Sequence, residues 1–453
     1  MNELVLKQKE FFRSEQTFPY AFRLSMLKKL KQGIVNHEKE LYDALYIDLG
    51  KPEIESRLTE VWFSLQELNE AIRKLKKWMK PVPVPTPLVN LPGKSSRIPS
   101  PLGVTLIISP WNYPFNLTIC PLVAAIAAGN TVLLKPSQHS KEVSKVIAKI
   151  IKENFPPEYI AVFEGGREQA DQLLSENFDH VFFTGSAAVG RKILARTSSS
   201  LARVTLELGG KSPCIVDEGV NITKVAKRIA FGKLINSGQT CIAPDYLICH
   251  ENIKDSLLKE INNQFHELYE GHFISNPQYG KIISRHHFER IETLLNQQKI
   301  IYGGQVNSEN LKIAPTIVEG NLENISMKEE IFGPILPVLT FKNAEDIKNI
   351  ISSNPNPLAF YLFSNNRKWV NQVISSNQFG GGCVNDTISH LIGSYLPFGG
   401  IKESGHGHYH GYHSFLTFSH LKSVYYKNTH FDLKIKYPPY SKFSSKLIKK
   451  FFK

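Results

Sequence analysis

Two residues that are capable of catalysis, a cysteine and a glutamate, lie close to glycines in the sequence. Cys241 ends residues 236–241 (NSGQTC), where small and polar neighbours are typical of an accessible nucleophile. A lone cysteine is more often a small buried apolar residue, so this stretch by itself leaves both interpretations open. Glu207 ends an apolar run before Gly209 and Gly210, a position that suits either a half-exposed strand end or a general base.

An asparagine is a third candidate, because Asn112 interrupts an apolar region within residues 110–114 (PWNYP). Its amide suits either a capped turn or a hydrogen-bond donor to an oxyanion. Residues 183–190 (FTGSAAVG) pass from a strand into a helix, where main-chain N–H groups and the positive helix end favour an anion such as a pyrophosphate. The spacing is not the GxGxxG fingerprint, and an ordinary turn is the more common explanation. Lys135, at the end of a strand, is likewise more often solvated than bound to a cofactor.

The apolar pattern predicts the elements that position these residues. Short apolar runs alternate with helical stretches from residue 103 onward, which favours a parallel, doubly wound sheet. The predicted strands are residues 104–109, 131–134, 161–164, 180–184 and 204–208, with helices at 141–153 and 168–176. A second α/β unit follows, with helices at 222–234 and 254–270 and strands at 246–250 and 335–341.

The N-terminal segments do not share this alternation. Residues 1–80 place apolar and charged positions at helical spacing, which predicts two or three surface helices. Residues 81–92 (PVPVPTPLVNLP) predict an extended arm and exclude a helix, because each proline removes a donor and restrains the residue before it.

Composition bounds the class of protein. The chain of 453 residues is 42% apolar and 21% charged, which suits two or three globular domains. Its five cysteines show no CxxC spacing, so we expect neither a disulfide framework nor a zinc site, and a reducing cytoplasm fits best. The N-terminus lacks the apolar core of a signal peptide, and no apolar run is long enough to span a membrane.

The net charge of +13 lies mainly at the C-terminus. Residues 421–453 hold nine lysines and one aspartate, so they contribute +8, and no nucleic-acid-binding motif accompanies them. Nucleic acid is therefore not an expected partner. The apolar residues Phe443, Leu447, Ile448, Phe451 and Phe452 recur at helical spacing between lysines. Such a helix suits an anionic membrane surface, while a solvated, frayed terminus explains the pattern equally well.

Taken together, the motifs resemble those of the NAD(P)-dependent aldehyde dehydrogenases over about residues 1–430. The matching motifs are residues 110–114 (PWNYP), 134–137 (LKPS), 183–186 (FTGS), 206–211 (LELGGK), 238–241 (GQTC), 329–334 (EEIFGP) and 396–400 (LPFGG). Residues 113–118 (YPFNLT) and 409–415 (YHGYHSF) look most like the class 3 branch, which acts on medium-chain, fatty and aromatic aldehydes.

The resemblance implies the catalytic roles. Cys241 would attack the aldehyde as a thiolate, and the Asn112 amide with the Cys241 N–H would hold the oxyanion. The intermediate would collapse by losing hydride to the nicotinamide, and Glu207 would activate the water that hydrolyses the thioester. A CoA-acylating relative and a catalytically silent binding protein are the alternatives. The presence of Glu207 argues against a CoA-acylating relative. The presence of Cys241, Asn112 and Glu207 together argues against a silent binding protein.

The resemblance also implies cofactor contacts. Gly185, Ser186 and Gly190 would lie near the phosphates, and Lys135 near the adenosine ribose. Glu330 and Phe332 would contact the nicotinamide ribose. Many members that prefer NAD carry a glutamate three residues after this lysine, where it repels a 2′-phosphate. The residue here is Gln138, so we expect NADP to be tolerated beside NAD.

The family pattern needs no metal, so the histidine-rich residues 406–413 are expected to be structural or solvated. The implied fold is α/β, with two doubly wound α/β domains and a small β oligomerisation element. A dinucleotide-binding domain would comprise residues 1–80 and 99–206, and a catalytic domain residues 207–384. Residues 81–98 and 385–430 would form the oligomerisation element of a homodimer, with a basic tail at 431–453.

Overall fold

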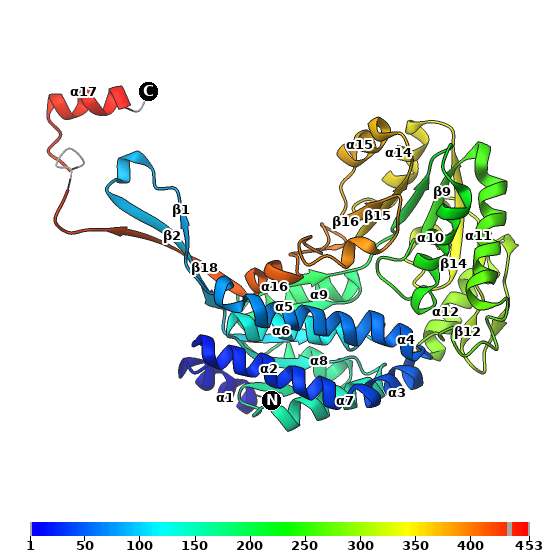
Figure 1. Ribbon diagram of the computed structural model, residues 1–453, viewed down its shortest axis with the longest axis horizontal. Coiled ribbons are helices and arrows are strands. Elements are labelled where there is room, and N and C mark those ends of the chain that lie inside the picture. Colours follow the sequence, from blue (N-terminus) through cyan, green and yellow to red (C-terminus); the bar gives the residue numbers. More distant parts are fainter. Residues whose placement is uncertain (1, 433–436, 452–453) are drawn as a thin grey trace.

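The computed structural model describes residues 2–432 and 437–451, and two largely parallel sheets dominate it (Figure 1). Both sheets carry helices on their faces, and a third, three-stranded antiparallel sheet extends away from them (Figure 1). This arrangement confirms the predicted fold class of two doubly wound α/β units with a small β element.

The N-terminal region departs from the prediction. The described part of residues 1–80 has five α-helices, α1 (Asn2–Arg13), α2 (Tyr20–Asn36), α3 (Glu38–Leu49), α4 (Glu53–Ser56) and α5 (Trp62–Trp78), with a π-helical segment at Arg57–Val61. Two or three surface helices were therefore too few, and their apolar faces are buried, as Leu27 and Leu45 show. The break at His37 contains no proline or glycine, so helical spacing runs through it, whereas the break at residues 50–52 carries both signals, Gly50 as a left-handed C-cap and Pro52 as the next N-cap.

The first sheet has the spatial order β5, β4, β3, β6, β7, all parallel, with β17 antiparallel beside β7. Its strands are β3 (Val104–Ile108), β4 (Thr131–Lys135), β5 (Ile160–Val162), β6 (His180–Thr184), β7 (Arg203–Glu207) and β17 (Gly405–His406). Its helices are α6 (Asn116–Ala128), α7 (Lys141–Asn154), α8 (Arg167–Leu173) and α9 (Ala187–Thr197). The strand order reverses between β3 and β6, so a ligand crevice is expected outside their carboxyl ends.

The second sheet has the order β10, β13, β14, β9, β8, β15, β16, and only its pairing of β10 with β13 is antiparallel. Its strands are β8 (Pro213–Val216), β9 (Tyr246–His250), β10 (Ile300–Tyr302), β13 (Thr316–Glu319), β14 (Ile335–Phe341), β15 (Ala359–Phe363) and β16 (Gly381–Val384). Its main helices are α10 (Ile222–Leu234), α11 (Lys254–Tyr269), α12 (Arg285–Asn296), α14 (Ala344–Ser352) and α15 (Arg367–Ser376). The predicted bounds of α10, β9 and β14 are confirmed.

The third sheet joins segments that are far apart in the sequence. It contains β1 (Val82–Val84), β2 (Gly93–Pro101) and β18 (Ser419–Lys427), and β18 pairs with the whole of β2. The proline-rich stretch is extended at β1, but it also holds one 3₁₀ turn at Leu88–Asn90, so the prediction that it excludes any helix was too strict. Proline tolerates the first turn of a helix, and Pro87 immediately precedes this one.

Helix α17 (Lys442–Phe451) confirms the helical spacing predicted for the tail, although Phe452 and Lys453 lie outside the described residues. Among the described helices, none is long and apolar enough to cross a membrane.

Candidate active site

Loops from both large sheets enclose one cavity of about 350 Å³. The first sheet contributes segments that follow β3, β6 and β7, and the second contributes segments that precede β9 and β14. The cavity is lined by Pro110, Trp111, Asn112, Leu117, Thr184, Gly185, Ser186, Glu207, Leu208, Gly209, Cys241, His287, Arg290, Glu329, Glu330 and Phe332. It brings together seven of the ten predicted site residues, whereas Lys135, Gln138 and Gly190 lie outside its lining.

The Cys241 loop packs directly on the segment that holds Glu330 and Phe332. Gly238 has a φ of +77°, and a Cβ there would lie 2.4 Å from the Gly333 carbonyl oxygen. Only glycine fits this close approach of two main chains. The packing explains why the motif at 238–241 and the motif at 329–334, which are distant in sequence, meet at one site.

Gln239 holds the same loop from the other side. Its side chain is fully buried, and Nε2 donates to the carbonyl oxygens of Asn236 and Lys281, each at 3.0 Å. Its Oε1 accepts from the N–H of Ile283 at 3.0 Å. These bonds fix the main chain two residues before Cys241.

The Cys241 thiol is half-buried in the cavity. Burial raises its pKa, and the Glu330 and Glu207 carboxylates raise it further. The thiol is therefore protonated near neutral pH in the protein alone, and a positive charge arriving in the cavity would favour the nucleophilic thiolate.

Asn112 is buried, with its amide oriented by the Cys241 loop. Its Nδ2 donates to the carbonyl oxygen of Gln239 at 3.0 Å. A carboxamide nitrogen carries two hydrogens, so this bond uses one and leaves the other to serve a ligand oxygen. A fixed amide donor in a cavity that also exposes a thiol suits attack on a carbonyl group.

Glu207 is the last residue of β7 and is 2% exposed. Neither carboxylate oxygen has a hydrogen-bond partner among the described residues. Burial raises the pKa of Glu207 well above its ordinary value of 4.5. An unpaired buried carboxyl group beside a thiol is a strong candidate for a general base with a raised pKa.

Glu330 and Phe332 are held by charged neighbours. Arg290 donates to Glu329 Oε1 at 3.0 Å and to the carbonyl oxygen of Ile331, while Lys211 donates to the carbonyl oxygen of Glu329 at 3.0 Å. Burial raises the pKa of Glu330 to about 8, which Asp245 reinforces and Lys211 opposes. Phe332 adopts a φ of +53°, a strained value for an aromatic residue, and its ring contacts that of Trp111 at 5.3 Å between centroids.

The part of the site predicted to hold phosphates lies at the start of α9. Ser186 is the N-cap of this helix and accepts from the N–H of Val189, while Gly185 and Ser186 line the cavity. Gly190 lies outside the cavity lining, where a Cβ would lie 2.9 Å from Leu208 Cδ2. The absence of a side chain at Gly190 therefore lets the helix pack closely on Leu208. The positive end of α9 thus faces the cavity, as an anionic ligand requires.

The carbonyl oxygens that bind Lys135 belong to Pro136 and Gly165, which line a second cavity of about 230 Å³ beside the first sheet. Lys135 is buried, and its Nζ donates to the carbonyl oxygens of Gly165 at 3.0 Å and Pro136 at 3.3 Å. Burial lowers its pKa. The exposed Gln138 lines this cavity together with Lys141 and Lys145. A buried ammonium group bound only to carbonyl oxygens fits a ligand hydroxyl or phosphate, which agrees with a dinucleotide cofactor.

The motifs did not point to every residue of the site. His287 and Arg290 lie on α12, at helical positions that carry no recognisable motif. The serine at 284, which accepts from the N–H of His287 as the N-cap of α12, was the available sequence signal, and it marks only a helix start.

Comparisons with known proteins agree with this geometry. The sequence profile described as the aldehyde dehydrogenase family matches residues 2–424. The chain is 44% identical over 448 residues to the 4,4'-diaponeurosporen-aldehyde dehydrogenase of Staphylococcus aureus, covering 98% of this chain and 97% of that protein. It is 39% identical to the dimeric NADP-preferring aldehyde dehydrogenase of Canis lupus familiaris, covering 97% of this chain and 98% of that protein.

A solved structure gives the same result. The substrate-bound state of Staphylococcus aureus AldH superposes with a TM-score of 0.97 at 43% identity, covering 100% of this chain and 99% of that one. Aldehyde dehydrogenase family 3 member A2 of Mus musculus is 39% identical, covering 97% of this chain and 92% of that protein, so class 3 relatives are among the most similar proteins, as the motifs at 113–118 and 409–415 predicted.

Proposed function

Because the chain belongs to the aldehyde dehydrogenase family, we propose that it oxidises an aldehyde to a carboxylic acid with NAD or NADP, using Cys241, Asn112 and Glu207. The observation that carries the assignment of these residues is their convergence on one cavity, which the start of α9 also borders. The test is absorbance of the reduced nicotinamide with short, fatty and aromatic aldehydes and each cofactor in turn. Reduction that depends on CoA would favour the acylating alternative, and no reduction at all would favour a binding protein.

The proposed reaction begins when Cys241 Sγ, after its thiol proton has passed to water, attacks the aldehyde carbon as a thiolate. The free hydrogen of the Asn112 amide and the Cys241 N–H donate to the oxyanion of the thiohemiacetal. NAD(P), when bound, supplies the acceptor for the hydride that leaves this carbon. Glu207 then takes a proton from the water that attacks the Cys241 thioester, and the acid is released.

Residues on two sides of the crevice would hold the dinucleotide. We assign Gly185 and Ser186 to the phosphates, Glu330 and Phe332 to the nicotinamide ribose and Lys135 to the adenosine ribose. Gly190 would act indirectly, because its contact with Leu208 lets α9 approach β7 closely.

The cofactor preference gives a first prediction. Replacing Gln138 by glutamate is expected to raise the KM for NADP at least about tenfold and to change that for NAD much less, because a carboxylate repels a 2′-phosphate. Steady-state rates over a range of each cofactor measure the effect. Gln138→Met, which adds no charge, is the matched control. A wild-type enzyme that already rejects NADP would contradict the role assigned to Gln138.

A medium-chain, long-chain or aromatic aldehyde is the proposed substrate class. The Staphylococcus aureus relative is named for 4,4'-diaponeurosporen-aldehyde. Class 3 is the branch that the motifs at 113–118 and 409–415 resemble, and it acts on aldehydes of this kind.

A homodimer is the proposed assembly, with residues 81–98 and 385–430 as its oligomerisation element. The dog relative is named as dimeric, and the strands β1, β2 and β18 leave the body as a separate sheet (Figure 1). The other proposed domains of the chain are a cofactor-binding domain at residues 1–80 and 99–206, a catalytic domain at residues 207–384 and a tail at residues 431–453.

A cytoplasmic location, with peripheral contact to membranes through the tail, completes the proposal. All five cysteines are free, which suits a reducing compartment. In α17, Phe443 is 73% exposed, and the lysines at 442, 446, 449 and 450 are exposed as well. Near an anionic surface each lysine contributes about 1 kcal/mol of attraction.

The tail gives a second prediction. The full chain is expected to sediment with anionic vesicles at low salt, and removal of residues 442–453 should abolish this while aldehyde oxidation in solution continues unchanged. Neutral vesicles are the control for non-specific capture. Equal sedimentation of both chains would show that the tail is only a solvated terminus.

A further inference from the structure

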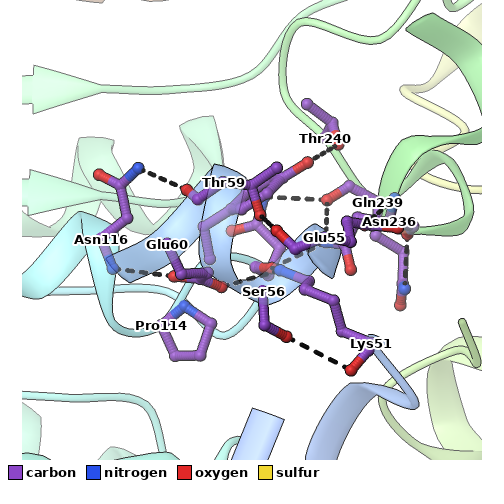
Figure 2. Close-up of polar contacts among 12 residues, drawn as sticks. Lys51, Glu55, Ser56, Thr59, Glu60, Pro114, Asn116, Asn236, Gln239 and Thr240 are labelled. Carbon is purple, nitrogen blue, oxygen red and sulfur yellow. Dashed lines mark hydrogen bonds and ion pairs between the residues drawn. The ribbon is translucent and has the colours of Figure 1, made fainter. Parts of the chain in front are cut away.

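A buried ion pair lies behind the site, outside the machinery assigned so far. Lys51 Nζ lies 2.8 Å from Glu60 Oε1, and their side chains are 1% and 0% exposed (Figure 2). Removing two charges from water costs free energy that their attraction often fails to recover, so such a pair is weak evidence for stability. What it contacts is therefore more informative than its presence.

Both members of the pair hold the segment that contains Asn112. Lys51 Nζ donates to the carbonyl oxygen of Asn112 at 3.4 Å and lies 4.1 Å from the centre of the Tyr113 ring. Glu60 Oε2 accepts from the N–H of Asn116 at 2.9 Å (Figure 2). Because Asn116 begins α6, this carboxylate also faces the positive end of a helix. The pair thus fixes residues 112–116 at both ends.

A local irregularity of the backbone directs Glu60 inward. Residues Arg57–Val61 form one π-helical turn between α4 and α5, and such turns are frequent at functional sites. The carbonyl oxygen of Thr59, in the same turn, accepts from Asn116 Nδ2 at 2.9 Å (Figure 2). The turn therefore faces the start of α6 with two acceptors.

A second set of hydrogen bonds connects residues 112–116 to the Cys241 loop. Asn236 Nδ2 donates to the carbonyl oxygen of Asn112 at 2.7 Å and to that of Gln239 at 3.1 Å. The N–H of Asn236 donates to Glu55 Oε1 at 2.8 Å (Figure 2). The Asn112 carbonyl oxygen therefore accepts hydrogen bonds from both Lys51 and Asn236, which belongs to the Cys241 loop.

We propose that Lys51 and Glu60 are positioning residues that orient the Asn112 amide toward the oxyanion formed at Cys241. They act through the Asn112 main chain, and neither lines the cavity around Cys241. This inference rests on the proposed roles of Asn112 and Cys241. An enzyme that reduces no cofactor with any aldehyde refutes those roles, whereas failure of the inference requires an active wild type with an equally active Lys51 variant.

The test measures the first-turnover rate of cofactor reduction, which reports thiohemiacetal formation and collapse before thioester hydrolysis. Lys51→Met is expected to lower this rate about 10- to 100-fold, since a shift of about 1 Å costs on this order, while the KM for NAD changes less than about threefold. Lys149→Met is the matched control, because Lys149 forms an exposed pair with Glu40 at 2.9 Å.

A double-variant cycle separates positioning from a general loss of structure. Asn112→Ala alone should lower the rate about 10²- to 10³-fold. Adding Lys51→Met to Asn112→Ala should lower it by less than about threefold more, because the amide being positioned is already gone. Effects that multiply would overturn the proposal.

A charge-free pair removes the concern that an unpaired buried carboxylate unfolds the protein. Lys51→Met with Glu60→Gln removes both charges of this pair, and its thermal midpoint checks the fold. A rate that stays low in this folded double variant supports positioning. A rate restored to that of the wild type would mean that the pair acts only by balancing charge, which overturns the inference.

Discussion

Replacing Cys241 by alanine is expected to lower cofactor reduction by a factor of at least about 10⁴ with every aldehyde. Cys241 is the only cysteine among the residues that line the main cavity, so no other described thiol can replace it there. The absorbance of the reduced nicotinamide measures the loss. Cofactor binding, followed by quenching of protein fluorescence, should remain within about threefold, because the residues assigned to the dinucleotide are unchanged.

A second cysteine variant provides the control. Cys383 is half-buried on β16, where its Sγ lies 3.5 Å from His390 Nδ1 and away from the cavity lining. Cys383→Ala should oxidise aldehydes at the wild-type rate. If Cys241→Ala kept a tenth of the activity, the covalent mechanism would be refuted while the assignment to the family would stand.

Replacing Glu207 by glutamine is expected to separate the two halves of the reaction. A general base typically contributes about 10²- to 10⁴-fold, so steady-state turnover should fall by that factor. The first turnover does not need the base, and it should survive as a burst of reduced cofactor. Mass spectrometry of the intact protein should then detect the acyl group on Cys241. Loss of the burst together with turnover would contradict a role confined to hydrolysis.

The pH dependence follows from the raised pKa of Glu207. Only the ionised carboxylate can accept a proton, and burial keeps the group protonated until the pH passes well above 4.5. Hydrolysis-limited turnover should therefore rise with pH in the wild type, and Glu207→Gln should lose this rise. The burst rate should also rise with pH, because burial raises the pKa of the Cys241 thiol, and that rise should persist in Glu207→Gln.

The apolar pattern along the chain was sufficient to predict the bounds of the buried strands. The strands β3, β4, β6 and β7 lie within two residues of their predicted bounds, because strands in a doubly covered sheet are largely apolar. The N-terminal helices were predicted less well. Their breaks at His37 and Gly50 depend on local caps that helical periodicity alone does not reveal.

The residues by themselves left the roles of Asn112, Glu207 and Cys241 open, and the resemblance of the combined motifs to one family made these three the predicted catalytic residues. Their meeting depends on contacts between distant segments, such as Gly238 on Gly333 and the pairing of β17 with β7. Protonation depends on folding too, because Glu207 acquires its raised pKa only when the surrounding chain excludes water.

Residue types and local spacing along this chain thus specify which reactive groups are available, because side-chain identity alone supplies a thiol, an amide and a carboxyl group. Distances, burial and the Lys51–Glu60 pair behind Asn112 arise only from packing, because they join residues that no local pattern relates.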